Sequence, residues 1–235
     1  MLPGPACQTH SGMELLAQGR DCDIFDLGDG TILRRSRKLY DQTLEAKILA
    51  YAAEHGYQVP AVHELRDDGT DLVMEKVEGP TLLQAIEKKP WKIGAYGRLL
   101  GELHVRLHEL PGPDFVPRID GGDRFLHFDL HPLNVILSPA GPVVIDWTNA
   151  CCGPPGTDIA RAWALMAAAE GPVTFPLNLI LGPARRWLVR SFVDAAGREE
   201  ARSGLRYGVE LTLLDENISD SEKDQMRALA DAEGV

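Results

Sequence analysis

The chain has 235 residues, of which 25% are charged and 44% are hydrophobic, a composition typical of a soluble globular protein with one large domain or two small lobes. Its net charge of −11 disfavours a nucleic-acid partner, because nucleic acids are bound largely through their phosphates. No apolar run is long enough to span a membrane, and the N-terminus lacks the basic and apolar regions of a signal peptide. We therefore expect a cytoplasmic protein with no membrane partner.

The four cysteines, Cys7, Cys22, Cys151 and Cys152, form no Cys-x-x-Cys pair, so neither a zinc ribbon nor a thioredoxin-like motif is indicated. We expect reduced thiols. The adjacent pair Cys151–Cys152 leaves a redox switch open as an alternative. Packing is favoured, because no cationic residue nearby in the sequence would lower a thiol pKa.

The first third of the chain predicts a small antiparallel sheet with one inserted helix. Residues 1–12, with two prolines and two glycines, form a loose lead-in. Short apolar segments separated by tight Asp-Gly turns predict two β-hairpins, 24–27 with 31–34 and 61–65 with 71–74. Between the hairpins, apolar residues recur at helical spacing over 41–54, which predicts a helix.

The pattern changes at Glu78-Gly79-Pro80, beyond which the chain is mainly helical. One helix carries an apolar stripe of leucines that ends at Pro111-Gly112-Pro113: Leu99, Leu100, Leu103, Leu107 and Leu110. A hairpin of 135–137 with 143–145 follows, and then helices over 159–169 and 184–195. The fold class is thus α+β with two lobes, residues 1–78 and 79–235, and clefts between lobes are common ligand sites.

Three oxygen-bearing side chains fall on one short unit of loop and hairpin. Asp129 lies in the loop, Asn134 lies where the hairpin begins and Asp146 lies where it ends. Because the two ends of a tight hairpin meet, Asn134 and Asp146 can face one site. Carboxylate and amide oxygens suit Mg²⁺ in company with substrate phosphates, and phosphoryl transfer needs in addition a carboxylate that positions the attacking hydroxyl.

At this point the sequence resembles the aminoglycoside phosphotransferase and choline kinase family, which shares the protein-kinase-like fold. The resemblance rests on His127-Phe128-Asp129-Leu130-His131-Pro132-Leu133-Asn134 and on Val144-Ile145-Asp146-Trp147. Further matches follow the family's order from Leu15 to Ala168: Gly19-Arg20-Asp21, Asp29-Gly30, Leu33-Arg34-Arg35, Val73-Met74-Glu75 and Asp158-Ile159-Ala160. Trp147 stands where protein kinases carry phenylalanine, which points toward small-molecule kinases.

The resemblance implies a phosphotransferase that moves the γ-phosphate of ATP or GTP to a hydroxyl of a small molecule with Mg²⁺. Asp129 would be the catalytic carboxylate, and Asn134 and Asp146 would bind the metal. His127 and Asp158 would support the loop. The acceptor stays open, because kinases of aminoglycosides, choline, homoserine, sugars and macrolides share these motifs, although the acidic composition is compatible with a cationic aminoglycoside.

The resemblance also implies a nucleotide site in the first lobe. Arg34 would reach the phosphates and pair with Glu45, with Arg35 as its rival. Residues Glu75 to Val77 would form a hinge whose backbone contacts the base, and the turn at Gly19 would cover the phosphates. The sequence departs from the family in carrying few glycines near Gly19 and in carrying Phe128 where glycine is frequent.

Two other functions stay open. The sparse glycines near Gly19 and the short chain leave a catalytically inactive nucleotide-binding module with a regulatory role. The pairs His104/His108 and His127/His131, each spaced by four, leave a metallohydrolase with zinc. An acidic stretch is expected to be a solvated face or, alternatively, part of a cationic substrate site: Asp215, Glu216, Asp220, Glu222 and Asp224.

Overall fold

The structure is a computed structural model. It describes residues 13–19, 21–38, 40–119, 121–168, 177–215 and 218–235, and for residues 177–181 it describes the backbone only. Cys7, Arg20, Glu216 and the expected lead-in 1–12 lie outside the described residues. The chain divides into two compact units, one made of residues 1–50 and 60–77, the other of residues 51–59 and 78–235.

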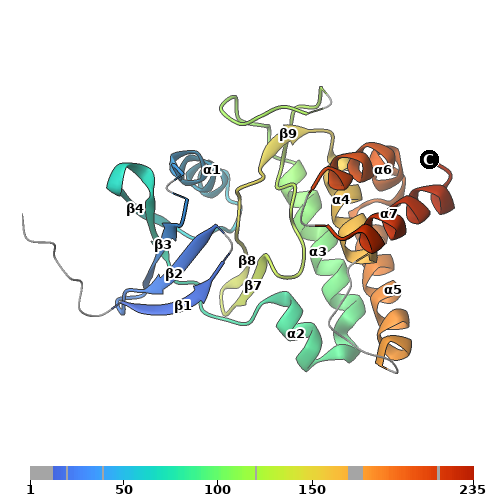
Figure 1. The fold of residues 1–235 in the computed structure, drawn as a ribbon, viewed down its shortest axis with the longest axis horizontal. Coiled ribbons are helices and arrows are strands. Elements are labelled where there is room, and N and C mark those ends of the chain that lie inside the picture. The colour runs from blue at the N-terminus through green and yellow to red at the C-terminus, as the bar shows by residue number, and fades with distance from the viewer. Residues whose placement is uncertain (1–12, 20, 39, 120, 169–176, 216–217) are drawn as a thin grey trace, which may run out of the picture. The chain divides into compact units, whose positions relative to one another are not determined.

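The first unit is a five-stranded antiparallel sheet with the strand order β1-β2-β3-β5-β4 (Figure 1). Its strands are β1 (Glu14–Gln18), β2 (Cys22–Asp26), β3 (Thr31–Ser36), β4 (Val62–Arg66) and β5 (Asp71–Glu75). Leu33, Leu72 and Val73 are buried on the central strands β3 and β5. Both predicted hairpins are therefore confirmed, and β3 and β5 pair directly.

Helix α1 (Thr43–Glu54) begins in the first unit and ends in the second, which includes its last turn from Tyr51. Asp41 starts it by accepting the backbone N–H of Thr43 at 2.8 Å, as expected of an aspartate beside the exposed donors of a helix start. Ile48 and Leu49 are buried one turn after Glu45, which is also buried. The predicted helix over 41–54 is confirmed to within two residues.

The second unit is mainly helical (Figure 1). Its helices are α2 (Leu82–Lys88), α3 (Ile93–His108), α4 (Pro155–Ala168), α5 (Leu177–Ala196), α6 (Arg198–Leu213) and α7 (Asp220–Glu233). Helix α3 packs on α5, and α4 packs on α6. The α4–α6 contact is close because Gly204 faces Gly156, and a Cβ at Gly204 would lie 2.2 Å from the Gly156 carbonyl carbon.

Two small antiparallel ribbons complete this unit: β6 (Arg124–Leu126) with β9 (Cys151–Gly153), and β7 (Val135–Ser138) with β8 (Gly141–Val144). Trp147 follows β8 and precedes β9 in the sequence, and its side chain is fully buried. Its contacts anchor both ribbons. Its ring stacks on Phe125 at 5.4 Å and meets Tyr57 edge-on at 5.7 Å, and its Nε1–H donates to the Val144 carbonyl at 3.1 Å. The residue after Asp146 is thus a fixed point of the core.

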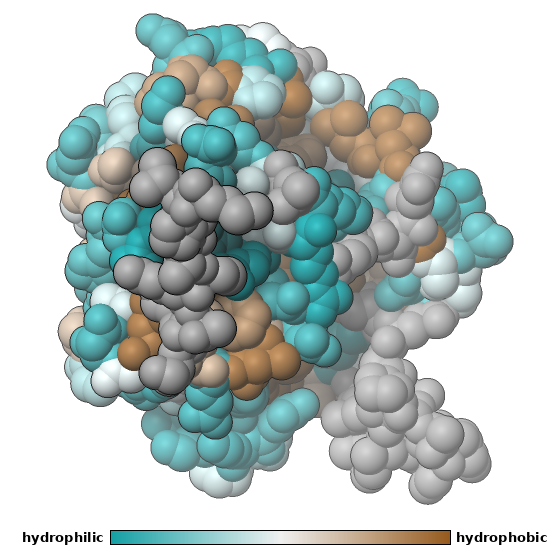
Figure 2. Space-filling model, turned by 60° about the vertical axis from the view of Figure 1, so that its left-hand side comes forward, coloured by the Kyte–Doolittle hydropathy of each residue, from teal (hydrophilic) through white to brown (hydrophobic). Residues whose placement is uncertain are grey.

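The α+β fold, with an antiparallel sheet first and helices after it, agrees with the sequence-based expectation. The leucine-rich helix ends at His108, earlier than expected, and Leu110 lies beyond it. The helix predicted over 184–195 is longer, with Pro183 inside it. On the face drawn in Figure 2, hydrophilic residues predominate and hydrophobic residues form separate patches. None of the helices in the described ranges has both the length and the apolar character to cross a bilayer.

Candidate active site

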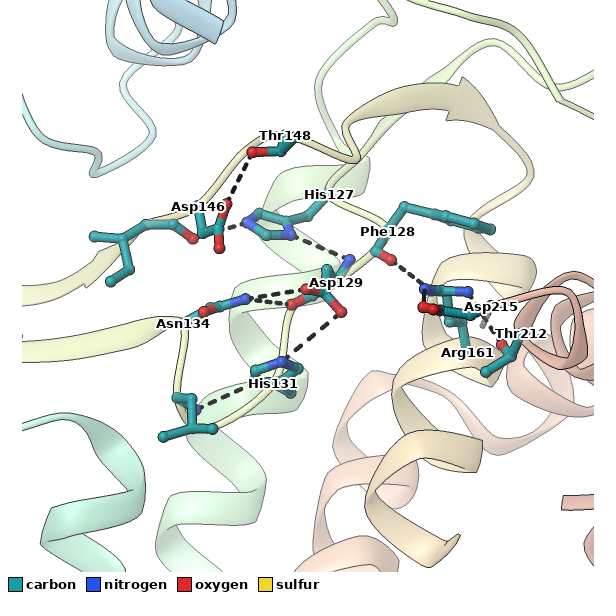
Figure 3. A network of polar contacts seen from close by, with 12 residues as sticks. His127, Phe128, Asp129, His131, Asn134, Asp146, Thr148, Arg161, Thr212 and Asp215 are labelled. Carbon is teal, nitrogen blue, oxygen red and sulfur yellow. Dashed lines mark hydrogen bonds and ion pairs between the residues drawn. The ribbon is translucent and has the colours of Figure 1, made fainter. Parts of the chain in front are cut away.

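The loop between β6 and β7 carries Asp129, and it is folded around that residue (Figure 3). The Asn134 side-chain amide donates to the Asp129 backbone carbonyl at 2.9 Å and lies 3.4 Å from its carboxylate Oδ2. The Asp129 side chain is 24% exposed, so it is partly shielded yet reachable. Burial raises the pKa of Asp129, and nearby His131, whose Nε2 lies 3.7 Å from Oδ1, opposes that rise.

The β7–β8 hairpin brings the next two predicted residues to its open end. The backbone N–H of Ile145 donates to the Asn134 carbonyl at 3.0 Å, so Asp146 follows directly on the residue paired with Asn134. Asp146 has a left-handed backbone, with φ of 63°, and its Oδ1 accepts the Thr148 hydroxyl at 3.0 Å. Asp129, Asn134 and Asp146 therefore belong to one hydrogen-bonded unit of loop and hairpin, as Figure 3 shows.

His127 connects this loop to the hairpin. Its Nδ1 accepts the backbone N–H of Asp129 at 3.2 Å, and its Nε2 lies 3.1 Å from the Ile145 carbonyl. These two bonds require a neutral imidazole that carries its proton on Nε2. The ring is fully buried against Trp147 at 4.6 Å, and burial lowers the pKa of His127. The neutral form is thereby favoured, and His127 serves as a brace.

Asp158, in the first turn of α4, holds the same loop from the other side. Its carboxylate accepts the backbone N–H groups of Phe128 at 2.9 Å and His127 at 3.2 Å, and also the His108 Nε2 at 2.9 Å. Burial acts to raise the pKa of Asp158, but the His108 hydrogen bond and the charges of His104, His108 and His127 together outweigh it, and the pKa lies below its ordinary value. The buried group is an ionised carboxylate with three donors.

Phe128 adopts a left-handed backbone, with φ of 64°. This conformation explains why glycine is frequent at the position in the family that the sequence resembles, because a residue with a Cβ is strained there. Arg161 of α4, which sequence reasoning did not single out, donates from Nε to the Phe128 carbonyl at 2.7 Å. The available signal was that Arg161 is the one charged residue within the predicted helix over 159–169.

In the first unit, the two neighbouring arginines of β3 pair with different carboxylates. Arg34 is hydrogen-bonded through Nη1 to the Glu45 carboxylate of α1, and both side chains are largely buried. Arg35 pairs instead with Asp71 on β5, from Nε at 2.9 Å and from Nη2 at 2.6 Å. The expected Arg34–Glu45 ion pair is thus confirmed, and Arg35 is committed to the sheet.

The other candidate residues of the first unit are Glu75, Val77 and Gly19. The backbone N–H of Glu75 donates to Ala61 at 2.8 Å within the sheet, so this donor is engaged, and Val77 is the last residue of the unit. Gly19 lies in the turn between β1 and β2, where its N–H donates to the Cys22 carbonyl at 2.8 Å. A Cβ at Gly19 would lie 2.9 Å from that oxygen, so the close turn requires glycine.

The four histidines of the zinc alternative are engaged otherwise. His104 bonds to the Leu100 carbonyl, His108 to Asp158 and His127 to the loop, and His131 Nδ1 accepts the N–H of Leu133 at 3.3 Å. Among the residues described, no group of three or more His, Cys, Asp or Glu is arranged to hold a metal ion.

The structure also describes three of the cysteines and most of the acidic stretch near the C-terminus. Cys22, Cys151 and Cys152 are free and buried, and burial raises the pKa of Cys151 to about 12, opposite to what a redox switch needs. The acidic stretch is divided: Glu222 caps the backbone N–H of Ser219 at the start of α7, and Asp224 pairs with Arg227. Asp215 lies 3.6 Å from Arg161, close to the loop.

Asn134 and Asp146 are the residues that could hold Mg²⁺. The Asn134 amide nitrogen is turned toward Asp129, so its oxygen points elsewhere, and Asp146 contributes a carboxylate at the same end of the hairpin. An amide oxygen and a carboxylate are hard donors that leave most of the coordination sphere to phosphates and water, as Mg²⁺ prefers. The donor set fits that ion.

A cavity of about 580 Å³ lies elsewhere in the second unit. Its lining includes Trp163 and four arginines, Arg185, Arg186, Arg190 and Arg198, and none of the site residues above. Two of these arginines form ion pairs with Asp194: Arg190 Nε lies 3.6 Å from Oδ2, and Arg198 Nη2 lies 3.1 Å from Oδ1. The cavity is therefore separate from the chemistry of the loop.

Residues 116–199 match the model of the phosphotransferase enzyme family. A choline/ethanolamine kinase family protein from Mesorhizobium loti aligns over 96% of this chain and 89% of its own, with 17% identity and a TM-score of 0.63. A thermostable mutant of aminoglycoside phosphotransferase APH(4)-Ia, in a complex with ADP and hygromycin B, aligns over 96% of this chain and 95% of its own, with 15% identity and a TM-score of 0.63. No curated protein sequence matches the chain.

A third solved structure, aminoglycoside phosphotransferase APH(3'')-Id from Streptomyces rimosus, aligns over 93% of each chain, with 14% identity and a TM-score of 0.60. The family match covers the segment that carries Asp129, Asn134, Asp146 and Asp158. The resemblance to the aminoglycoside phosphotransferase and choline kinase family is thereby confirmed, and the chain has the fold of these small-molecule kinases.

Proposed function

We propose that this protein transfers the γ-phosphate of ATP or GTP to a hydroxyl group of a small molecule, with Mg²⁺. The observation that carries the proposal is the position of Asp129, Asn134 and Asp146 on one hydrogen-bonded unit of loop and hairpin, braced by His127 and Asp158. A carboxylate with two oxygen donors beside it is the equipment that phosphoryl transfer requires of a protein.

In the proposed reaction, the Asp129 carboxylate accepts the proton of the acceptor hydroxyl. The hydroxyl oxygen forms a bond to the γ-phosphorus while the bond from phosphorus to the bridging oxygen breaks, leaving a nucleoside diphosphate. The partly buried position that raises the pKa of Asp129 makes it a better base than an exposed aspartate. The Asn134 amide, bonded to the Asp129 carbonyl, keeps that carboxylate in place.

Asn134 and Asp146 would hold Mg²⁺, which neutralises phosphate charge when bound. Arg34, held by Glu45, would contact the phosphates, since a guanidinium can bind two phosphate oxygens at once. The turn at Gly19 would cover the phosphates. The backbone of Glu75–Val77 would contact the base, with Val77 supplying the donor because the Glu75 N–H is engaged in the sheet.

The net charge and the structural neighbours support a ranking of acceptor classes. The net charge of −11 favours a cationic acceptor over an anionic one, because an acidic surface concentrates cations. The structural neighbours include aminoglycoside phosphotransferases and a choline/ethanolamine kinase family protein. We therefore place aminoglycosides first and amino alcohols second among the acceptors.

The alternative of an inactive nucleotide-binding module is disfavoured by the complete set of Asp129, Asn134 and Asp146. It makes a different prediction for the Asp129→Asn variant. In a kinase, Asp129→Asn keeps Mg²⁺-nucleotide binding and loses turnover by about 100- to 10,000-fold, the usual worth of a catalytic base. In an inactive module, wild type and Asp129→Asn bind alike and neither turns over.

The test is calorimetric titration of wild type, Asp129→Asn and Asp146→Asn with ATP and GTP, with and without Mg²⁺, followed by turnover assays with hygromycin B, gentamicin, streptomycin, choline and ethanolamine. The proposal expects Mg²⁺-dependent nucleotide binding that only Asp146→Asn weakens, and a phosphorylated product from wild type. Nucleotide binding that is indifferent to Mg²⁺ and to Asp146 would contradict the assigned metal ligands.

A further inference from the structure

Arg161 makes a three-way connection inside the second unit (Figure 3). Its Nε donates to the Phe128 carbonyl at 2.7 Å, its Nη1 donates to the Thr212 hydroxyl at 3.3 Å, and its Nη2 lies 3.6 Å from the Asp215 carboxylate. The residue is buried, and its guanidinium carbon lies 4.9 Å from the centre of the Phe128 ring. Helix α4 thus connects the end of α6 to the loop beside Asp129.

The geometry uses the properties that distinguish arginine from lysine. Three nitrogens of one planar group face three partners from different directions, and the plane also contacts an aromatic ring. An ammonium group is a point charge on a flexible stem and cannot make these contacts together. Burying a guanidinium costs free energy unless it is paired. The partners of Arg161 meet this requirement, and their arrangement suits arginine and not lysine.

The contact falls on a residue whose backbone is strained. Phe128 has a φ of 64°, a conformation that costs a residue with a Cβ about 1–2 kcal/mol. Asp158 holds the Phe128 N–H and Arg161 holds the Phe128 carbonyl, so both sides of the strained residue are fixed by α4. Asp129 follows Phe128 directly, and its direction therefore depends on these two anchors.

We propose that Arg161 is a positioning residue, which transmits the packing of Thr212 in α6 and of Asp215 just after α6 to the Phe128 carbonyl and so sets the orientation of the Asp129 carboxylate. This inference rests on the proposed function of Asp129. Because a misplacement of about 1 Å can cost a reaction about 100-fold, loss of the clamp lowers kcat while leaving the Mg²⁺-nucleotide affinity unchanged.

The variants are Arg161→Met, Arg161→Lys and Thr212→Val, with Arg198→Met as the matched control. Arg198 also contacts an aromatic ring, Trp163 at 5.8 Å, and an aspartate, but it makes no described contact with the loop. Thr212→Val removes the outer end of the clamp and touches the loop only through Arg161. For each variant, kcat and KM are measured with Mg²⁺-ATP and hygromycin B. If hygromycin B is not an acceptor, hydrolysis of ATP by water is measured instead. Amide exchange is measured over residues 127–134.

Arg161→Met is expected to lower kcat about 10- to 100-fold with little change in KM for ATP, and to speed amide exchange in the loop but not in α3. Arg161→Lys should not restore the rate. Thr212→Val should lower kcat less, and have no further effect when combined with Arg161→Met. Arg198→Met should leave kcat and loop exchange unchanged.

Unchanged loop exchange in Arg161→Met, or full rescue by lysine, would overturn the inference. So would a Thr212→Val effect that persists without Arg161. Amide exchange needs no turnover, so it separates the two claims: faster loop exchange in Arg161→Met with an inactive wild type would support the clamp and contradict the proposed kinase activity.

Discussion

The carboxylate of Asp158 accepts the backbone N–H of Phe128 at 2.9 Å, so the first turn of α4 fixes the loop one residue before Asp129. The same carboxylate accepts the His127 N–H and the His108 ring. The side chain of Asp158 thus holds two backbone N–H groups of the loop and the His108 ring. We therefore expect substitution of Asp158 to lower the free energy of unfolding of the protein and, through the loop, the rate of the proposed reaction.

Asp158→Asn should lower the free energy of unfolding by roughly 2–3 kcal/mol, because a charged acceptor for three donors becomes an amide whose NH₂ group faces donors. Urea unfolding monitored by circular dichroism measures the change. Asp224→Asn is the control, since it removes an exposed pair with Arg227 and should cost less than about 1 kcal/mol. Equal effects of the two variants would refute the assigned role of Asp158.

Phe128→Gly should be more stable than Phe128→Ala by about 1 kcal/mol. Both variants remove the ring that contacts Arg161, so their difference reports the backbone alone. In most positions glycine is the less stable of the two, but at a φ of 64° alanine carries the strain. Thermal or urea unfolding of both variants measures the order, and alanine being the more stable would show that the left-handed conformation is absent.

Arg34→Met should raise the dissociation constant for Mg²⁺-ATP about 10- to 100-fold, the worth of a hydrogen bond to a charged group, whereas Arg35→Met should change it little. The reason is that Arg34 is held by Glu45, while Arg35 is committed to Asp71 within the sheet. Calorimetric titration of both variants makes the comparison. A larger loss of affinity in Arg35→Met would reverse the assignment of the phosphate-binding arginine.

The stability of the fold should fall as pH drops from about 6.5 to 4, in part through His104. Burial lowers the pKa of His104 to about 4, so the unfolded chain binds this proton more tightly than the folded chain does. Stability from this group is thus complete above the unfolded pKa and is lost as pH falls toward the folded pKa. Asp158 and His108 lie nearby, and the Phe192 ring is 5.0 Å away.

The measurement is urea unfolding between pH 4.5 and 6.5 for wild type and His104→Phe. In the variant, the slope of the free energy of unfolding against pH should be smaller by up to about 1.4 kcal/mol per pH unit, which is the contribution of one proton. His63→Gln is the control for removal of an imidazole, because the His63 side chain is exposed. A slope that His104→Phe does not alter would mean that this ring is protonated equally in both states.

Much of the fold was predictable because its signals are local. The Asp-Gly turns, the helical spacing over 41–54 and the hairpin after Asn134 all act within a few residues, and the structure has each of them. The ribbon of β6 with β9 was missed because it joins residues 124–126 to 151–153, which no local pattern links. Strand β1 was missed because its residues are exposed and do not alternate between apolar and polar.

Two missed helices did carry a local signal. Thr81 with Gln84 before α2, and Ser219 with Glu222 before α7, form capping boxes in the structure, and that spacing is readable from sequence. The candidate site was predictable through its motif, which includes Asp129, Asn134 and Asp146. Arg161 was not, because its partner Phe128 lies 33 residues away and only the three-dimensional structure shows that they meet.

The most direct test of the central claim is to follow the label of γ-³²P-ATP and γ-³²P-GTP, with Mg²⁺, in wild type and Asp129→Asn. Hygromycin B, gentamicin, streptomycin, choline and ethanolamine serve as acceptors, and the products are separated by chromatography. The proposed activity predicts that the wild type moves the label to the hydroxyl of at least one acceptor and that Asp129→Asn does so at least about 100-fold more slowly. Label transfer that is equally fast in Asp129→Asn would contradict it, as would a wild type that binds no nucleotide.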